Sequence, residues 1–159
     1  MTRHATVLLL CLAAVALAGC APSFTLPLPE RFVVLEDEDR DPTAGYVQRA
    51  TTPDGVVVGL RALDHRVEGT LAFWSEAVIR QLRDHRGYAV LGEEEIRAAS
   101  GQPGRLYRLG RDLDGHAYRY TVAVFVTDDH IWVADAGGRE EPFAALEPQV
   151  EQAFASLEL

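Results

Sequence analysis

Apolar and polar residues alternate along much of the chain in a way that predicts β-strands. The longest such segment is 116–127, where one face carries Tyr118, Tyr120, Val122, Val124 and Val126. The opposite face carries Ala117, Ala123 and Phe125. A strand that is apolar on both faces is typical of the centre of a sheet that is covered on both sides. The pattern therefore predicts a sheet between two layers.

A hairpin is predicted before this strand. Residues 45–51 and 56–63 are rich in β-forming residues, and they flank a polar gap that contains Asp54-Gly55. Further strands are predicted at 31–35, 88–95, 105–111 and 131–136. Turns are expected at 100–104 and 112–115, and Gly137-Gly138 is expected to end the sheet.

Two segments have helical periodicity. In segment 71–86 an apolar stripe is formed by Leu71, Trp74, Val78 and Leu82. Gly69 or Thr70 can cap its start, and Gly87 can end it in a left-handed conformation. The second stripe comprises Phe143, Leu146, Val150, Phe154 and Leu157. Proline is tolerated in a first helical turn, so Pro142 and Pro148 predict a short helical turn followed by a final helix.

The order of these elements is strand, hairpin, helix, antiparallel meander, helix. This order predicts the α+β class: an antiparallel sheet of about six or seven strands, sandwiched by a central helix and a C-terminal helix. A chain of 159 residues has room for one such domain. We place that domain at 30–159, a signal peptide at 1–19 and a lipidated cysteine with a proline-rich tether at 20–29.

The N-terminus has the features of a secretory signal. Arg3 and His4 precede an apolar run at 5–18, which is too short to span a bilayer. The tetrapeptide Leu17-Ala18-Gly19-Cys20 resembles the lipobox of bacterial lipoproteins. That resemblance implies diacylglyceryl transfer to the Cys20 thiol, cleavage before Cys20 and acylation of the new amine. The alternative is a plain signal peptide with an accidental cysteine.

Net charge and cysteine content limit the classes of partner and the covalent links that the protein can have. The net charge of −9 argues against a nucleic-acid-binding protein. The same charge should repel anionic headgroups, so the lipid on Cys20 would hold the protein to the membrane. Cys11 would leave with the signal peptide, which excludes a disulfide in the mature chain. Ala21 after the cysteine favours the outer membrane by resemblance to the lipoprotein sorting pathway, with the domain facing the periplasm.

The mature domain resembles the Mog1/PsbP-like α/β/α sandwich family. The likeness is carried by the hairpin before Leu71–Arg86, the meander 104–110, 118–125 and 131–136, and the closing helix Glu147–Leu157. Members of that family are mostly accessory subunits, assembly factors and binding partners. The family has no shared catalytic residues that could be carried over to this sequence, so the resemblance implies a class of behaviour rather than an activity.

Candidate chemistry is sparse. The acidic run Glu36–Asp41 is either a weak Ca²⁺ site or a solvated loop. The mature histidines show no metal-ligand spacing, so we expect no metal and no cofactor, with His116 and His130 as the first pair to test. Ser75 and Ser100 lack the surrounding motif of a hydrolase nucleophile.

Arg108 and Arg119 form a possible anion- or partner-binding pair. A four-residue loop at 112–115 would place them opposite each other, where like charges need a carboxylate or a ligand between them. A two-residue loop at Asp114-Gly115 would offset them, and internal pairing with Glu or Asp is the alternative. If Trp132 is exposed, it would indicate a protein–protein interface.

These observations predict a lipid-anchored protein of the bacterial cell envelope. Its expected role is non-catalytic binding to another envelope component, whose identity the sequence leaves open. One alternative is a lipoprotein that binds a small ligand or an ion, either an anion or Ca²⁺. The other is an unrecognised hydrolase, because catalytic groups converge in space rather than in sequence.

Overall fold

The computed structural model describes residues 23–35 and 45–159. Its elements in chain order are β1 (Val33–Val34), β2 (Tyr46–Thr51), β3 (Val57–Asp64), α1 (Leu71–Arg86), β4 (Ala89–Arg97), β5 (Pro103–Leu113), β6 (His116–Val126), β7 (His130–Arg139), α2 (Glu140–Ala144) and α3 (Glu147–Ala155). This order confirms the predicted α+β class. Cys20, the lipobox and the acidic run at 36–41 lie outside the described residues.

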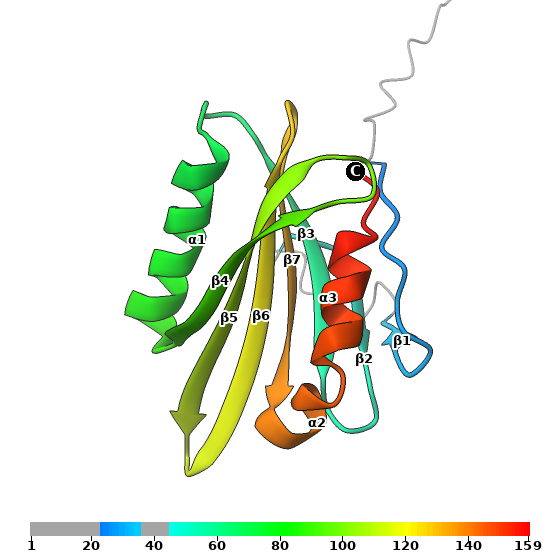
Figure 1. Cartoon of the computed structure of the whole chain (residues 1–159), viewed down its shortest axis with the longest axis vertical. Helices are drawn as coiled ribbons and strands as arrows, with labels where there is room; N and C mark the ends of the chain where they lie inside the picture. Colours follow the sequence, from blue (N-terminus) through cyan, green and yellow to red (C-terminus); the bar gives the residue numbers. More distant parts are fainter. Residues whose placement is uncertain (1–22, 36–44) are drawn as a thin grey trace, which may run out of the picture.

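The strands form one seven-stranded sheet in the order β1-β2-β3-β7-β6-β5-β4. Every neighbouring pair is antiparallel. Helix α1 lies on one side of the sheet and α3 on the other (Figure 1). Strand β6 lies in the interior of the sheet between β7 and β5, as its two apolar faces predicted.

Each side of the sheet has its own core. Val122 and Val124 of β6 belong to the cluster under α1. Ala123 and Phe125 belong to the cluster under α2 and α3, which also contains Phe154. The side chains of β6 therefore alternate between the two cores, as its sequence pattern predicted.

The predicted helix boundaries of α1 are confirmed by its caps. The Thr70 hydroxyl accepts a hydrogen bond from the Phe73 N–H, at 3.2 Å. Gly87 ends the helix in the left-handed region with φ of 68°. Asp114 and Gly115 have φ of 52° and 75° and form a two-residue turn between β5 and β6.

Gly137 and Gly138 do not end the sheet, so that prediction was wrong. Strand β7 continues through both to Arg139. A Cβ atom at Gly137 would lie 2.5 Å from Cδ2 of Tyr120, and one at Gly138 would lie 3.1 Å from Cγ2 of Val56. The glycines are therefore places of close approach within the strand.

The domain begins earlier than residue 30. The Thr25 N–H donates to the Glu158 carbonyl at 3.0 Å, and Leu26 is 5% exposed. The ring of Phe24 lies 5.9 Å from that of Trp132. The segment predicted to be a tether is thus part of the folded domain from residue 24 onward. Nowhere in 23–35 and 45–159 is a helix long and apolar enough to cross a bilayer.

A tyrosine–arginine surface as the candidate functional site

Arg108 and Arg119 lie on the α3 side of the sheet, and carboxylates of this chain already bind both. Arg108 donates to Glu151 at 2.5 Å and to Glu94 at 2.7 Å. Arg119 donates to Glu140 at 2.5 Å. Arg108 lies opposite Thr121, so the two-residue turn offsets the arginines. Arg108 and Arg119 therefore pair with carboxylates inside the protein, which was the alternative to an anion-binding pair. They no longer support an anion site.

Trp132 is a core residue. It is 2% exposed, and its indole N–H donates to the Thr127 hydroxyl at 3.3 Å. An interface that requires exposure of Trp132 is therefore excluded.

The histidine pair is also separated. His116 begins β6 and His130 begins β7, so the two lie at opposite ends of the sheet. His65 Nδ1 lies 3.0 Å from the Thr127 carbonyl, and its Nε2 accepts from the Trp74 indole at 3.3 Å. The described segments contain no group of three or more potential metal-ligating His, Cys, Asp or Glu side chains. His65 instead connects the start of α1 to the β6–β7 turn.

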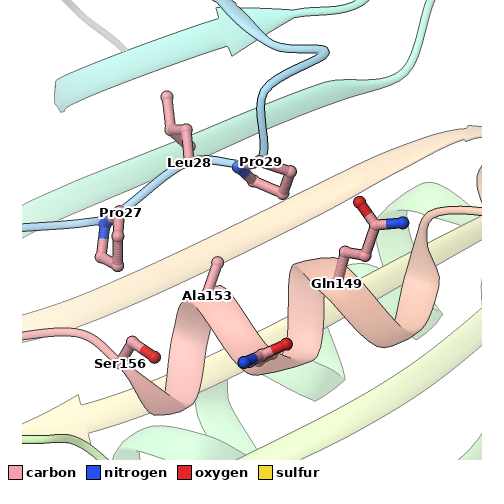
Figure 2. A pocket seen from close by; sticks show the side chains of 7 residues that line it. Pro27, Leu28, Pro29, Gln149, Ala153 and Ser156 are labelled. Carbon is pink, nitrogen blue, oxygen red and sulfur yellow. The ribbon is translucent and has the colours of Figure 1, made fainter.

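A small hollow of about 260 Å³ lies between the N-terminal segment and α3. Figure 2 shows Pro27, Leu28 and Pro29 on one side and Ala153, Gln149 and Ser156 on the other. None of its lining residues carries a charge at neutral pH. The lining supplies no acid, base or charged anchor, so we do not assign the functional site here.

Asp135 is a buried charge in an otherwise apolar stretch of β7. Ala134 and Ala136 face the core under α3, whereas Val133 faces the core under α1. Asp135 therefore points to the α1 side, and it is 3% exposed. A buried carboxylate requires hydrogen-bonding or ionic partners.

Two side chains donate to this carboxylate. Arg61 Nη2 lies 2.6 Å from Oδ2 of Asp135. The Tyr46 hydroxyl lies 3.3 Å from each carboxylate oxygen. The Tyr120 side chain interacts electrostatically with the same carboxylate. Strands β2, β3 and β6 therefore all direct polar side chains at one residue of β7.

Two glycines make room for the two tyrosine rings. Gly59 lies opposite Asp135 in the sheet. A Cβ at Gly59 would lie 2.3 Å from Cε1 of Tyr46, so the Tyr46 ring occupies the space above Gly59. Gly137 makes room for Tyr120 in the same way. Side chains at both positions would block the approach of the tyrosines to Asp135.

The Tyr46 ring also contacts two guanidinium groups. The Cζ atoms of Arg49 and Arg61 each lie 5.3 Å from its centroid. Both distances are within the range of cation–π attraction. Tyr46 thus links the charged cluster at Asp135 to Arg49 on β2.

The cluster continues across β6 to β5. The rings of Tyr88 and Tyr120 are stacked, with centroids 5.3 Å apart. The Cζ of Arg111 lies 4.6 Å from the Tyr88 centroid and 6.0 Å from the Tyr118 centroid. We call the whole set the tyrosine–arginine surface: Tyr46, Arg49, Arg61, Tyr88, Arg111, Tyr118 and Tyr120. All seven side chains are half-buried.

Burial and charge perturb the titratable groups here. Burial raises the pKa of the Asp135 carboxyl, and the Arg61 guanidinium partly opposes this. Burial and then the Asp135 charge raise the pKa of both Tyr46 and Tyr120. The tyrosines therefore stay protonated and remain donors at neutral pH. Groups with perturbed pKa values that gather in one place mark a candidate functional site.

Helix α1 covers only part of this side of the sheet. The core under α1 includes residues of β5, β6 and β7 and none of β2 or β3. Arg61 is neutralised by Asp135, but Arg49 and Arg111 lie within salt-bridge distance of no carboxylate in 23–35 or 45–159. This surface is thus locally positive in a chain of net charge −9.

Our sequence reasoning missed this site. One signal was present: Asp135 interrupts a run of apolar residues in a predicted strand, which is typical of a buried charge with a partner. The identity of the partners depends on register, which the sequence pattern did not provide.

Comparisons with known proteins support the fold. No family model matches the sequence, and no curated protein matches it by sequence. The structure is similar to that of the cyanobacterial PsbP protein of Synechocystis, with a TM-score of 0.60, 11% identity and coverage of 86% of each chain. It is also similar to LpqN of Mycobacterium tuberculosis, which is involved in cell envelope biogenesis, with a TM-score of 0.60 and 12% identity over 87% of this chain and 85% of that one.

A third similar structure is the Ran-binding protein Mog1p of Saccharomyces cerevisiae. Its TM-score is 0.60 at 11% identity, over 85% of this chain and 89% of that one. At such low identity the likeness concerns architecture rather than activity. The chain therefore has the Mog1/PsbP-like fold.

Proposed function

We propose that this protein is a lipid-anchored component of the bacterial cell envelope that binds another envelope protein and catalyses no reaction. The lipobox ending at Cys20 supports the anchor. The structural likeness to LpqN, an envelope biogenesis protein, and to a Ran-binding protein is consistent with such a role.

The tyrosine–arginine surface is the observation that carries the proposal. Tyrosine and arginine are enriched among the residues that dominate binding energy at protein interfaces. Here they form one contiguous network that α1 leaves partly uncovered. A buried charge cluster holds its central residues in place, so their rotamers are fixed before a partner binds.

The position of Cys20 is consistent with this arrangement. Only Ala21 and Pro22 lie between Cys20 and Ser23 in the sequence, so chain length limits the anchor to about 10 Å from the start of the described chain. Phe24 contacts Trp132, whereas Tyr118 lies opposite Arg139 in the sheet. Trp132 and Arg139 are seven residues apart on β7, or about 23 Å. The Tyr118 end of the surface would therefore project away from the bilayer.

Affinity capture from detergent-solubilised envelopes tests this function. The baits are the lipidated protein, a Cys20→Ala variant, and the double variant Arg49→Glu/Arg111→Glu. The matched control is Arg66→Glu/Arg80→Glu, which changes the charge equally at exposed ion pairs elsewhere. We expect one envelope protein to be retained by the lipidated bait and the control and lost from Arg49→Glu/Arg111→Glu. Retention by that variant, or no enrichment by a folded and anchored bait, would contradict the proposal.

A further inference from the structure

We infer that the tyrosine–arginine surface binds an extended acidic segment of the partner protein, with carboxylates held by Arg49 and Arg111. This inference rests on the proposed function and adds the chemistry of the partner to it.

The first argument is charge complementarity. The chain as a whole is acidic, with a net charge of −9. Arg61 already has Asp135, whereas Arg49 and Arg111 form no ion pair with a carboxylate of residues 23–35 or 45–159, so these two arginines carry the net positive charge of the surface among the described residues. An acidic segment would be attracted to these arginines while the acidic remainder of the domain disfavours it elsewhere. Binding should therefore weaken as salt rises.

The second argument is that the surface already binds one carboxylate. Asp135 is held by the Arg61 guanidinium and the Tyr46 hydroxyl. An arginine beside a tyrosine occurs again where Arg49 lies over Tyr46 and where Arg111 lies over Tyr88. The same two side-chain types are thus available to carboxylates that come from outside the chain.

The guanidinium groups are also positioned in advance. Among the residues that the structure describes, the buried Nε atoms of Arg49 and Arg111 have no hydrogen-bond partner, so a ligand would meet their outer Nη atoms. Arg111 Nη1 donates to the Arg86 carbonyl at 3.0 Å, which fixes the group at the C-terminal end of α1. Arginines held in this way lose less conformational freedom on binding.

The third argument is spacing. From Arg49 on β2 to Arg111 on β5 the sheet order crosses four strand intervals, about 19 Å. In register, Arg49 is level with Tyr107, which precedes Arg111 by four residues, or about 13 Å. The Cα atoms of the two arginines are therefore about 23 Å apart. An extended segment spans that distance with carboxylates about seven residues apart, which a small anion cannot do.

Fluorescence polarisation with a synthetic peptide of about 13 residues tests the inference on the full-length protein in detergent. The probe carries two pairs of glutamates about seven residues apart in a neutral background. One control peptide has glutamine in place of glutamate, and another has the pairs about three residues apart. The protein variants are Arg49→Gln/Arg111→Gln and the control Arg66→Gln/Arg80→Gln.

We expect saturable binding of the probe that weakens with salt. Affinity should fall about tenfold or more for the glutamine peptide and for Arg49→Gln/Arg111→Gln, and less for the closely spaced peptide. Arg66→Gln/Arg80→Gln should change it by less than about twofold. Failure of the probe to bind, or equal losses in both double variants, would overturn the inference.

An assay with lipid vesicles tests whether the tyrosine–arginine surface binds a polypeptide or a lipid. Vesicles of phosphatidylglycerol and phosphatidylcholine are mixed with the Cys20→Ala protein and its Arg49→Gln/Arg111→Gln derivative. Vesicle binding that requires the two arginines, without peptide binding, would assign the surface to lipid and overturn the inference. Should the peptide fail while envelope capture still depends on Arg49 and Arg111, the proposed function stands and only the acidic partner is excluded.

Discussion

The two sides of the sheet use the same residue types with opposite results. On the α3 side, arginines of the sheet find carboxylates from the C-terminal helices: Arg108 pairs with Glu151 and Arg119 with Glu140. On the α1 side, Arg49 and Arg111 find aromatic rings instead. The difference arises because α2 and α3 direct acidic residues at the sheet. On the other side, Arg49 is on β2, outside the core under α1, and Arg111 on β5 meets the Arg86 carbonyl at the end of α1. The α3 side, where arginines and carboxylates are paired, stabilises the fold. The α1 side, where Arg49 and Arg111 pair with no carboxylate of the described segments, is available for binding.

The largest expected effect is a loss of stability from a change in the core on the α3 side of the sheet. Phe154 is 0% exposed, and Phe154→Ala should lower the free energy of unfolding by about 4 kcal/mol through lost burial and the resulting cavity. Phe73, which is 56% exposed on α1, is the matched control, and Phe73→Ala should change stability by less than about 0.5 kcal/mol. Urea denaturation measures both. Similar losses would show that the α3 core is not the main source of stability.

The next largest effect is expected at Asp135. Asp135→Ala leaves the Arg61 guanidinium and the Tyr46 hydroxyl without their acceptor, and it should lower the free energy of unfolding by about 3 kcal/mol. Asp135→Asn keeps an oxygen acceptor and should cost less. Urea denaturation of the two variants provides the comparison. Unchanged stability of Asp135→Ala would mean that the cluster does not support the surface.

A smaller effect distinguishes paired from unpaired arginines. Arg108→Gln breaks two ion pairs and should cost about 1 kcal/mol. Arg49→Gln breaks none among the described residues and should stay within about 0.5 kcal/mol of the wild type. Thermal and urea unfolding measure both. The opposite ranking would make Arg49 the structural residue and would argue against its role in binding.

The smallest effect is an alkaline loss of stability. The pKa of Tyr46 and that of Tyr120 are raised by burial from 10.0, so the folded state retains these protons at a pH where the unfolded state releases them. Stability from these groups is therefore complete below pH 10 and falls as pH rises above it. We expect the melting temperature to drop above that pH, and Tyr120→Phe to drop less steeply. A parallel decline in both proteins would exclude Tyr120 as a cause.

Local signals predicted most of the fold. Thr70 and Gly87 mark the ends of α1, and the two apolar faces of 116–127 place β6 in the sheet interior. The function-bearing cluster depends on contacts between distant residues. Arg61 and Tyr46 lie 74 and 89 positions from Asp135 in the sequence. Only the register of β2, β3, β6 and β7 brings them together, and a pattern of apolar and polar residues does not specify that register uniquely.

The glycines and arginines illustrate the same limit. Gly137 reads as a strand breaker when it is considered alone, but in the sheet it makes room for the Tyr120 ring. Arg108 and Arg119 appeared to be a potential anion site until the turn at Asp114-Gly115 fixed their register and the helices supplied carboxylates. In both cases the role of a residue depends on its neighbour across the strands.

The most direct test of the central claim is site-specific photocrosslinking in living cells. A photoreactive phenylalanine analogue is placed at Tyr118, which is half-buried on this surface, in the lipidated protein, and at Gln149, which is exposed on α3, as the control. We predict a discrete adduct with one envelope protein from position 118 and none from position 149. No adduct from position 118 of a folded, anchored protein, or the same adduct from both positions, would contradict the assignment of binding to the tyrosine–arginine surface.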